Sequence, residues 1–300
     1  MKVLIAGASG FLGKALVADL PAHGHSVSTL VRRPPTAASE IEWHPERGEL
    51  APAALEGVDA VISLSGAGVS DKRWNAAYKR ELLDSRVQPT ATISATLAAL
   101  PTADRPRAFL SASAIGYYGE RGDERLSEAA SAGTGFLADL VQQWEAATAP
   151  ADEAGVRVAT LRTGLVLSAS GGLLKRLVPL FKLGAGGNLG PGTQYQAWIS
   201  LADEIVAIRH VLEAESLSGP VNLAGPQPVT NKEFSQTLAK VLHRPALAPA
   251  PAFALRLALG EFADEGVLVS QRVIPEKLSE DGFHFQHQDV HAALVWATKN

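Results

Sequence analysis

The first thirteen residues constrain the fold of this chain more than any other stretch. Residues 3–6 form a short apolar run of the kind found in strands buried on both faces, and Gly7, Gly10 and Gly13 follow it. An amphipathic stretch then covers residues 11–20. A strand, a glycine-rich turn and a helix in this order predict a βα unit whose turn holds the diphosphate of a nucleotide.

Each glycine of the turn has a separate physical task. Gly7 permits the tight turn, Gly10 lets the backbone approach a diphosphate, and Gly13 lets the helix pack close to the strand. The free N–H groups and the positive end of the helix dipole favour an anion there. The predicted contacts come from Gly7, Ser9, Gly10, Phe11, Leu12 and Gly13.

Two alternatives to this interpretation exist. A phosphate-binding P-loop is excluded, because Ala8 stands where that motif needs glycine and Ala15 where it needs serine or threonine. A glycine turn that binds no ligand stays open as the alternative.

Composition narrows the class of protein. The 300 residues are 46% hydrophobic and 19% charged with a net charge of −4, as in ordinary globular proteins, and no basic tract suggests nucleic acid. The absence of cysteine removes disulfides, thiolate nucleophiles and cysteine-based metal sites. The apolar run near the N-terminus is too short for a signal peptide. We therefore expect a cytoplasmic protein with neither nucleic acid nor membrane among its partners.

Apolar runs alternate with helical patterns along the first half of the chain. Strands are expected at residues 26–31, 59–64, 107–112 and 156–161, with helices between them and no hairpin signal. This pattern predicts an α/β fold with a doubly wound parallel sheet, a Rossmann fold. We place the nucleotide-binding core at residues 1–165, with a strand near 220–224 returning to it, and a smaller substrate lobe at residues 166–300.

Local signals refine this outline. Pro89 is expected to kink or break a long helix over residues 75–100. Glycines and prolines between residues 171 and 192 predict loops. Ser200 and Thr230 each begin a capping box, and the apolar residues 253–259 are expected to pack onto the first lobe.

The end of the second strand selects the nucleotide. Arg32 and Arg33 follow Val31, and the nearest acid downstream is Glu40. A carboxylate at this place binds a ribose 2′-hydroxyl, whereas arginine binds a 2′-phosphate, so the pair predicts NADP(H) in preference to NAD(H). A pair of solvated surface arginines is the alternative. Further cofactor contacts are expected where other strands end, at Leu64, Ser65, Gly66, Ala67 and Ser111.

Several motifs together resemble one family. They include residues 7–13, Asp84-Ser85-Arg86, residues 111–119, Gly135-Phe-Leu-Ala with Trp144-Glu145, residues 161–166, Trp198-Ile-Ser, residues 222–226, 230–234, Gly260-Glu261 and residues 271–275. The chain resembles an extended short-chain dehydrogenase/reductase of the NAD(P)-dependent epimerase/dehydratase superfamily. More narrowly, it is similar to an atypical epimerase-like group that has a small C-terminal domain and is sometimes labelled as cell-division inhibitors.

The resemblance implies a catalytic tyrosine and a lysine four residues later on one helix, with a serine or threonine at the reacting oxygen. Ser113 matches the serine position. None of the four tyrosines has a lysine four residues on, so the usual acid–base pair is missing. Tyr117 and Tyr118 are the candidate substitutes, and Arg121 is the nearby cation expected to favour a phenolate.

Three readings of the chemistry remain open. A substitute phenol acts as the acid, or water supplies the proton during a reduction by NADPH, or the protein binds NADP(H) without turnover as a regulator. The resemblance implies an oxidoreductase or isomerase for a small carbonyl or sugar-type substrate, and a homodimer is one expected assembly. Gly164, Leu165 and Val166 are expected at the nicotinamide. Substrate contacts are expected from Trp74, Arg86, Gln196 and Trp198, and no histidine pattern predicts a metal.

Overall fold

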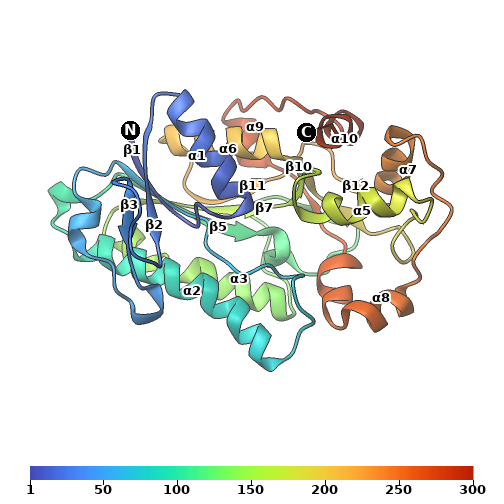
Figure 1. Ribbon diagram of the computed structural model, residues 1–300, viewed down its shortest axis with the longest axis horizontal. Coiled ribbons are helices and arrows are strands. Elements are labelled where there is room, and N and C mark those ends of the chain that lie inside the picture. The colour runs from blue at the N-terminus through green and yellow to red at the C-terminus, as the bar shows by residue number, and fades with distance from the viewer. Residues whose placement is uncertain (300) are drawn as a thin grey trace.

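A seven-stranded parallel sheet forms the centre of the computed structural model, which describes residues 1–299 (Figure 1). The strand order is β11-β7-β5-β4-β1-β2-β3, so the chain winds outward from β1 in both directions, as predicted. Right-handed twist and buried apolar faces are typical of such sheets. The strands are β1 Lys2–Ala6, β2 Ser26–Val31, β3 Glu40–Glu42, β4 Ala60–Ser63, β5 Ala108–Ala114, β7 Arg157–Thr163 and β11 Gly219–Leu223.

Helices cover both faces of the sheet (Figure 1). One face carries α1 (Phe11–Ala22) and α6 (Leu201–Glu213), which pack on each other, and the short α9 (Glu276–Glu280). The other face carries α2 (Ala76–Ala99), α3 (Phe136–Ala146) and α4 (Ala149–Glu153). The two faces have separate apolar cores, one around Ile5 and Leu161 and the other around Leu4 and Phe109.

The expected break at Pro89 is wrong, because α2 runs without interruption from Ala76 to Ala99. Pro89 itself is buried, and so are Leu82, Ile93 and Leu97 on either side of it. Burial of apolar side chains from both halves outweighs the hydrogen bond that a proline removes from a helix.

The second lobe is built from short strands and helices around its own core. Trp198, Phe181 and Phe234 are fully or almost fully buried in it. Its elements are β8 Leu165–Leu167 paired with β10 Trp198–Ser200, β9 Tyr195–Gln196 paired with β12 Val229–Thr230, α5 Gly172–Lys182, α7 Asn231–Val241, α8 Ala252–Leu259 and α10 Val290–Ala297.

Short elements complete the chain. The pair β6 Arg125–Leu126 and β13 Arg272–Val273 joins the loop after β5 to the C-terminal segment. The remaining turns are the 3₁₀ helices Pro45–Arg47, Pro52–Leu55, Thr102–Asp104 and Ile115–Tyr118 and the π-helical turn Ala263–Val267.

Two expectations for the second lobe need correction. Residues 171–192 were expected to be loops, but they contain α5, whose apolar positions Leu174, Val178 and Phe181 form a buried face. Residues 253–259 were expected in a smaller lobe that packs on the first; α8 does touch the first lobe, where Arg73 donates to the Leu257 carbonyl at 3.1 Å, but it buries none of its residues. The N-caps of the two predicted capping boxes are confirmed, because the Ser200 and Thr230 hydroxyls accept hydrogen bonds from the backbone three residues on.

No helix within residues 1–299 is both long and apolar enough to cross a bilayer.

Candidate active site

The glycine turn between β1 and α1 has no room for side chains. Gly7 has a φ of +80°, and a Cβ there would lie 2.7 Å from the carbonyl carbon of Leu64. A Cβ on Gly13 would collide with the carbonyl oxygen of Gly7. The Gly10 N–H donates to that same oxygen at 3.0 Å. The turn therefore presents backbone rather than side chains, as the sequence predicts.

The first turn of α1 supplies the donors for an anion. Gly10 is its N-cap and provides no side-chain acceptor, and the turn contains no acidic residue. The N–H groups of Phe11, Leu12 and Gly13 have no helical carbonyl to bond. Ser9 and Gly10 are exposed. These groups form a cradle that fits a diphosphate.

The two arginines after β2 differ in their partners. Arg33 donates to both carboxylate oxygens of Glu40, at 2.6 and 2.9 Å. The Arg33 hydrogen bonds are the main reason that the pKa of Glu40 falls to about 2. Arg32 is exposed, and no residue within 1–299 bonds to its side chain. The expectation of two free guanidiniums is therefore corrected to one, because Glu40 neutralises Arg33.

The loop after β4 is held in place by a hydrogen bond from α2. Its residues Leu64, Ser65, Gly66 and Ala67 are partly or fully accessible. Arg86 donates to the Ala67 carbonyl at 2.8 Å and also to its own helix at Leu82. Burial lowers the pKa of Arg86 to about 10. Arg86 thus supports the loop after β4, which corrects its expected place as a substrate contact.

Ser111 is another predicted cofactor contact, and the structure places it elsewhere. Its side chain is fully buried inside the sheet, and its hydroxyl donates to the Ala112 carbonyl at 3.2 Å. The hydroxyl is therefore not available to a cofactor, because it is completely buried and its hydrogen is bound to a backbone carbonyl.

Ser113, near the end of β5, is fixed by an ion pair beneath it. Its hydroxyl donates to Glu145 Oε1 at 2.6 Å. Arg162 of β7 binds the same carboxylate with two hydrogen bonds, at 2.8 and 2.7 Å. Burial alone would lower the pKa of Arg162, but the bonds and charge of Glu145 outweigh it and hold that pKa above its ordinary value. Ser113 is itself buried, and its hydroxyl hydrogen points to Glu145, so only its oxygen lone pairs are left to accept a further hydrogen bond.

The two candidate tyrosines occupy different environments. Tyr118 is fully buried, and its hydroxyl donates to Asn222 Oδ1 at 2.7 Å while accepting from Arg162 at 3.1 Å. Burial is the main cause that raises the pKa of Tyr118. The Tyr117 ring is half-buried, with the Arg162 guanidinium 3.4 Å from its centre. No residue within 1–299 bonds the Tyr117 hydroxyl. The structure therefore gives Tyr118 an anchoring position and leaves Tyr117 free to meet a ligand.

Arg121 does not reach either phenol oxygen in the way the sequence suggested. It pairs with Glu124 at 2.7 Å and donates to the Ser131 carbonyl. The cation that meets Tyr117 and Tyr118 is Arg162 instead.

The end of β7 opens toward the second lobe. Gly164 lies against backbone, since a Cβ there would be 2.7 Å from the Ala197 carbonyl oxygen. Gly164, Leu165 and Val166 are all partly accessible, so they line the edge where a nicotinamide is expected. Gln196 is partly buried, and its side-chain oxygen has no hydrogen-bond partner among residues 1–299.

Two tryptophans were expected to touch substrate. Trp198 is completely buried and donates to the Gln227 carbonyl at 2.8 Å, so it is part of the lobe core. Trp74 is partly exposed and donates to the Val69 carbonyl at 2.8 Å. Its ring packs against Phe136 and Phe262, with centroids 5.0 and 5.4 Å away. Trp74 therefore joins the two lobes.

The C-terminal segment also completes α3. The Glu265 carboxylate accepts from the N–H groups of Phe136 and Leu137, at 3.1 and 3.0 Å. A carboxylate at a helix N-terminus satisfies free donors and complements the dipole. This helix is where the missing tyrosine–lysine pair was expected.

Glu204 is a buried acid that the sequence analysis missed. It lies in the first turn of α6 and is fully buried, and Thr163 donates to its Oε1 at 2.9 Å. Its other oxygen has no partner among residues 1–299. Burial raises the pKa of Glu204 to about 8, so the carboxyl is largely protonated at neutral pH.

Comparison with known families identifies the family of this chain. Residues 3–224 match the family model described as the NAD dependent epimerase/dehydratase family. The chain belongs to this family. Residues 250–297 match a second model, described as a domain of unknown function. The observed sheet and cradle agree with this membership.

Relatives of this epimerase-family chain extend over its whole length. It is 48% identical to the epimerase family protein Mb2239 of Mycobacterium bovis, covering 99% of this chain and 97% of that protein. It is 32% identical to human epimerase family protein SDR39U1, covering 98% of each. The crystal structure of human SDR39U1 (isoform 2) with NADPH matches with a TM-score of 0.91 and 31% identity over 100% of both chains.

Proposed function

We propose that this epimerase-family protein is an NADP(H)-dependent oxidoreductase or isomerase acting on a small carbonyl or sugar-type substrate. The main support is the side-chain-free turn at Gly7 and Gly13 beside the unpaired guanidinium of Arg32. A diphosphate and a further phosphate group suit these two features together. The human relative SDR39U1 was crystallised with NADPH, which favours the same cofactor here.

The residues fit such a cofactor along one edge of the sheet. The first turn of α1 would hold the diphosphate, Arg32 the 2′-phosphate, and Leu64–Ala67 the adenosine side. Gly164–Val166 would meet the nicotinamide. NADPH, when bound, supplies a hydride.

On the reaction side, we propose Tyr117 as the proton donor and acceptor. Its hydroxyl is unbonded, and its ring lies on Arg162, whose charge Glu145 holds in place. Ser113 would accept a hydrogen bond from a substrate hydroxyl, since its own hydrogen is bound to Glu145. This arrangement would replace the missing tyrosine–lysine pair by a phenol with a cation against its ring.

The cofactor half of the proposal is tested by binding. Arg32→Ala should weaken NADPH binding by about tenfold or more and leave NADH binding unchanged, because one charge-assisted phosphate contact is lost. Arg33→Ala is the matched control, since Glu40 already occupies that guanidinium. Fluorescence titration of both nucleotides gives the answer. Equal NADH and NADPH affinities, unchanged in Arg32→Ala, would contradict the proposed preference.

The catalytic half is tested by turnover. NADPH oxidation is measured with a panel of carbonyls, and epimerisation with a panel of sugar nucleotides, using the parent protein, Tyr117→Phe and Tyr118→Phe. Tyr117→Phe should bind NADPH normally and lose turnover. The competing reading is a non-catalytic NADP(H)-dependent regulator. Tight NADPH binding with no turnover on any panel member would favour it, and the missing tyrosine–lysine pair is the observation behind it.

The cellular location, the partners and the oligomeric state of the protein are also proposals. The lack of cysteine suits the reducing cytoplasm, although a 35% identical relative from Arabidopsis thaliana is described as chloroplastic. We expect a small-molecule substrate rather than nucleic acid, and a homodimer stays a prediction. Fractionation of the source cells and light scattering of the purified protein would test placement and assembly.

A further inference from the structure

The large apolar side chains exposed to solvent gather in one part of the molecule. Within residues 1–299, the large apolar side chains that stand out as exposed all come from α5 and the residue after it, the segment after α7, and α8. They are Leu180, Leu183, Leu247, Phe253 and Leu257, exposed by 47, 82, 81, 72 and 75%. Single exposed leucines are ordinary, whereas a group of them marks an interaction surface.

The same segments carry positive charge in a protein that is negative overall. Residues 154–202 and residues 234–260 contain no aspartate or glutamate. Their exposed bases are Lys175, Arg176, Lys182, Lys240, Arg244 and Arg256. With a net charge of −4 for the whole chain, the basic surface is a local feature.

Only part of this charge is neutralised by neighbours. Arg256 pairs with Asp264 at 2.9 Å, and Arg176 lies 3.7 Å from Asp71. The three lysines have no partner among residues 1–299, and Arg244 donates only to carbonyl groups. Glu261, the acid that follows α8, is taken by Lys79 at 2.6 Å.

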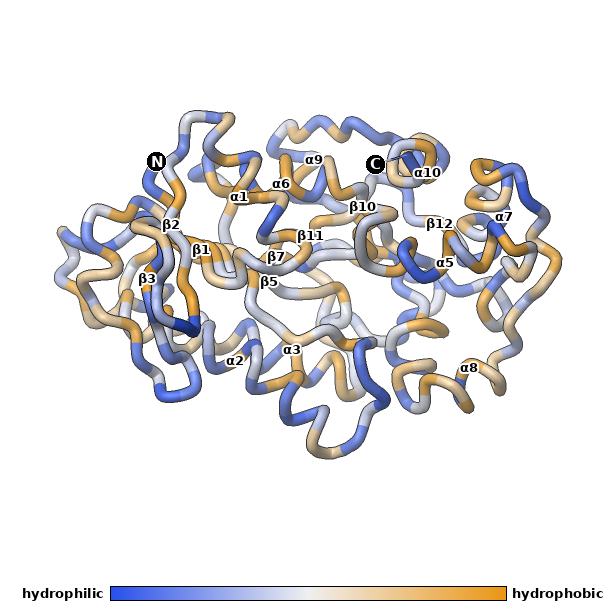
Figure 2. Tube along the Cα trace, in the orientation of Figure 1, coloured by the Kyte–Doolittle hydropathy of each residue, from blue (hydrophilic) through white to orange (hydrophobic). Residues whose placement is uncertain are grey.

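Hydrogen bonds join α5, the end of α7 and the segment after α7, and α8 follows that segment in the chain; we call these segments together the basic apolar end. Arg244 donates to the Lys182 carbonyl, so the ends of α7 and α5 lie together. The Ala248 N–H donates to the Gly186 carbonyl at 3.0 Å, which holds the segment of Leu247 against the loop of Leu183. Figure 1 shows α5, α7 and α8 at one end of the longest axis, opposite β3, and Figure 2 shows apolar colour along α8.

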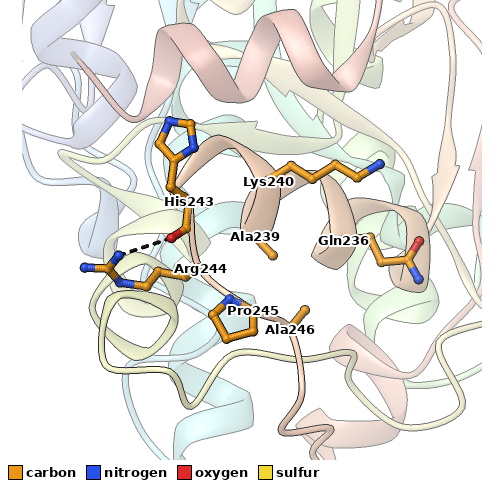
Figure 3. Close-up of a pocket in the computed structure, with 7 residues that line it drawn as sticks. All are labelled: Gln236, Ala239, Lys240, His243, Arg244, Pro245 and Ala246. Atoms are coloured by element: carbon orange, nitrogen blue, oxygen red, sulfur yellow. Dashed lines mark hydrogen bonds between the residues drawn. The ribbon is translucent and has the colours of Figure 1, made fainter.

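A hollow lies within the basic apolar end. It has a volume of about 560 Å³ and is open to solvent. Figure 3 shows Lys240, His243 and Arg244 at its border, with Pro245 and Ala246 below them. It shares no residue with the cofactor cradle. The Lys240 and Arg244 side chains extend to opposite sides of the hollow, so they add two bases to this surface without forming a phosphate pocket, and Leu247 lies three residues after Arg244.

We propose that the basic apolar end docks the protein on an anionic phospholipid surface, with its exposed bases at the lipid phosphates and the exposed leucines and Phe253 in the interfacial layer. Apolar side chains set among uncompensated bases are the recognised composition of such contacts. Two copies of this surface face to face would oppose like charges, which disfavours a symmetric dimer through it. The sequence-based expectation of no membrane partner rested on spanning segments, whereas this contact lies on the surface.

The test is co-sedimentation of the full-length protein with vesicles. Equal parts of phosphatidylcholine and phosphatidylglycerol should bind it, and phosphatidylcholine alone should not. Lys175→Glu with Lys182→Glu should lower binding about fivefold or more per residue, because each base near an anionic surface contributes on that order. Arg47→Glu with Arg107→Glu is the matched control, since those arginines are 63 and 64% exposed and lie on other elements. Its binding should stay unchanged.

A second variant separates the apolar contribution from charge. Phe253→Ser with Leu257→Ser should lower vesicle binding about tenfold at constant net charge, and circular dichroism checks that α8 persists. Binding to anionic vesicles that is absent, or that falls equally in the control, would overturn the proposal. Three other results would also overturn it. The protein forms a dimer that Leu183→Ser with Leu247→Ser dissociates, or it captures polyglutamate without binding vesicles, or it binds inorganic phosphate alone.

Discussion

The two sides of the candidate active site are built in different ways. On the cofactor side, the turn at Gly7–Gly13 and the first turn of α1 offer backbone groups, and no side chain fills the space. On the reaction side, Ser113, Tyr118 and Glu145 are placed by a buried network around Arg162. The first side depends on the absence of side chains, and the second on side chains that come from distant parts of the chain.

This difference separates binding from stability. A cradle made of backbone groups buries few side chains and so contributes little to stability. Damage to it should therefore mainly reduce affinity for the nucleotide. A buried ionic network holds strands and helices together, so damage to it should mainly reduce the free energy of unfolding. The following variants test this contrast, beginning with the largest effect.

Arg162→Met should lower the free energy of unfolding by about 3–5 kcal/mol, because it leaves the Glu145 carboxylate buried without its cation. The double variant Arg162→Met with Glu145→Leu should recover part of this loss, since no buried charge remains. Arg121→Met, at the half-exposed pair with Glu124, is the control and should cost less than about 1 kcal/mol. Urea unfolding measures all three. A small loss in Arg162→Met would show that the network does not carry stability.

Glu204→Gln tests whether the buried carboxyl of α6 is protonated in the folded protein. The folded pKa of Glu204, about 8, lies above its ordinary value of 4.5, so the folded state binds the proton more tightly than the unfolded state. Between pH 5 and pH 8 this residue should therefore reduce stability as pH rises, by up to about 1.4 kcal/mol per pH unit. Unfolding measured across this range should show a shallower fall in Glu204→Gln. Identical slopes would contradict a buried, protonated acid.

Gly13→Ala should reduce NADPH affinity by about a hundredfold, because its Cβ would collide with the Gly7 carbonyl and distort the cradle. Stability should fall by only about 1–2 kcal/mol. Gly10→Ala is the graded control, as its Cβ would lie 3.2 Å from the same oxygen and can be accommodated with smaller shifts. Titration with NADPH and urea unfolding of each variant separate affinity from stability. A greater loss of stability than of affinity would reverse the contrast drawn here.

Tyr118→Phe should cost about 1–2 kcal/mol of stability, because Asn222 and Arg162 lose a buried hydrogen-bond partner. Tyr117→Phe removes a hydroxyl that bonds to nothing within residues 1–299, and should change stability by less than about 0.5 kcal/mol. Thermal unfolding of the two single variants makes the comparison. Equal losses would mean that the two tyrosines are not divided between anchoring and ligand contact.

The cofactor side was predictable from sequence because its signal is local. Gly7, Gly10 and Gly13 lie within the single turn between β1 and α1, and their spacing alone predicts the path of the backbone there. The reaction side was not, because Ser113 and Glu145 are 32 residues apart and Glu145 was visible only as part of a motif. Arg33 was misjudged although Glu40 is only seven residues away, since their pairing depends on how β2 and β3 lie side by side.

Errors in the second lobe have another cause. Glycine and proline around residues 171–192 obscured α5, whose buried face is set by contacts with α7 and β8 rather than by propensity. The apolar run in α8 resembles a core helix, and no local pattern distinguishes a buried apolar helix from an exposed one.

The carboxylate of Glu265 at the start of α3 has a consequence for biosynthesis. A chain emerging from the ribosome presents α3 long before residue 265. Until then the first turn of that helix has only water for its free donors, and the opening of the cleft near Trp74 lacks Phe262. The nucleotide-binding half should therefore reach its final form only after translation is almost complete, and nascent chains that stop near residue 250 should be more accessible to proteases around α3 than finished ones.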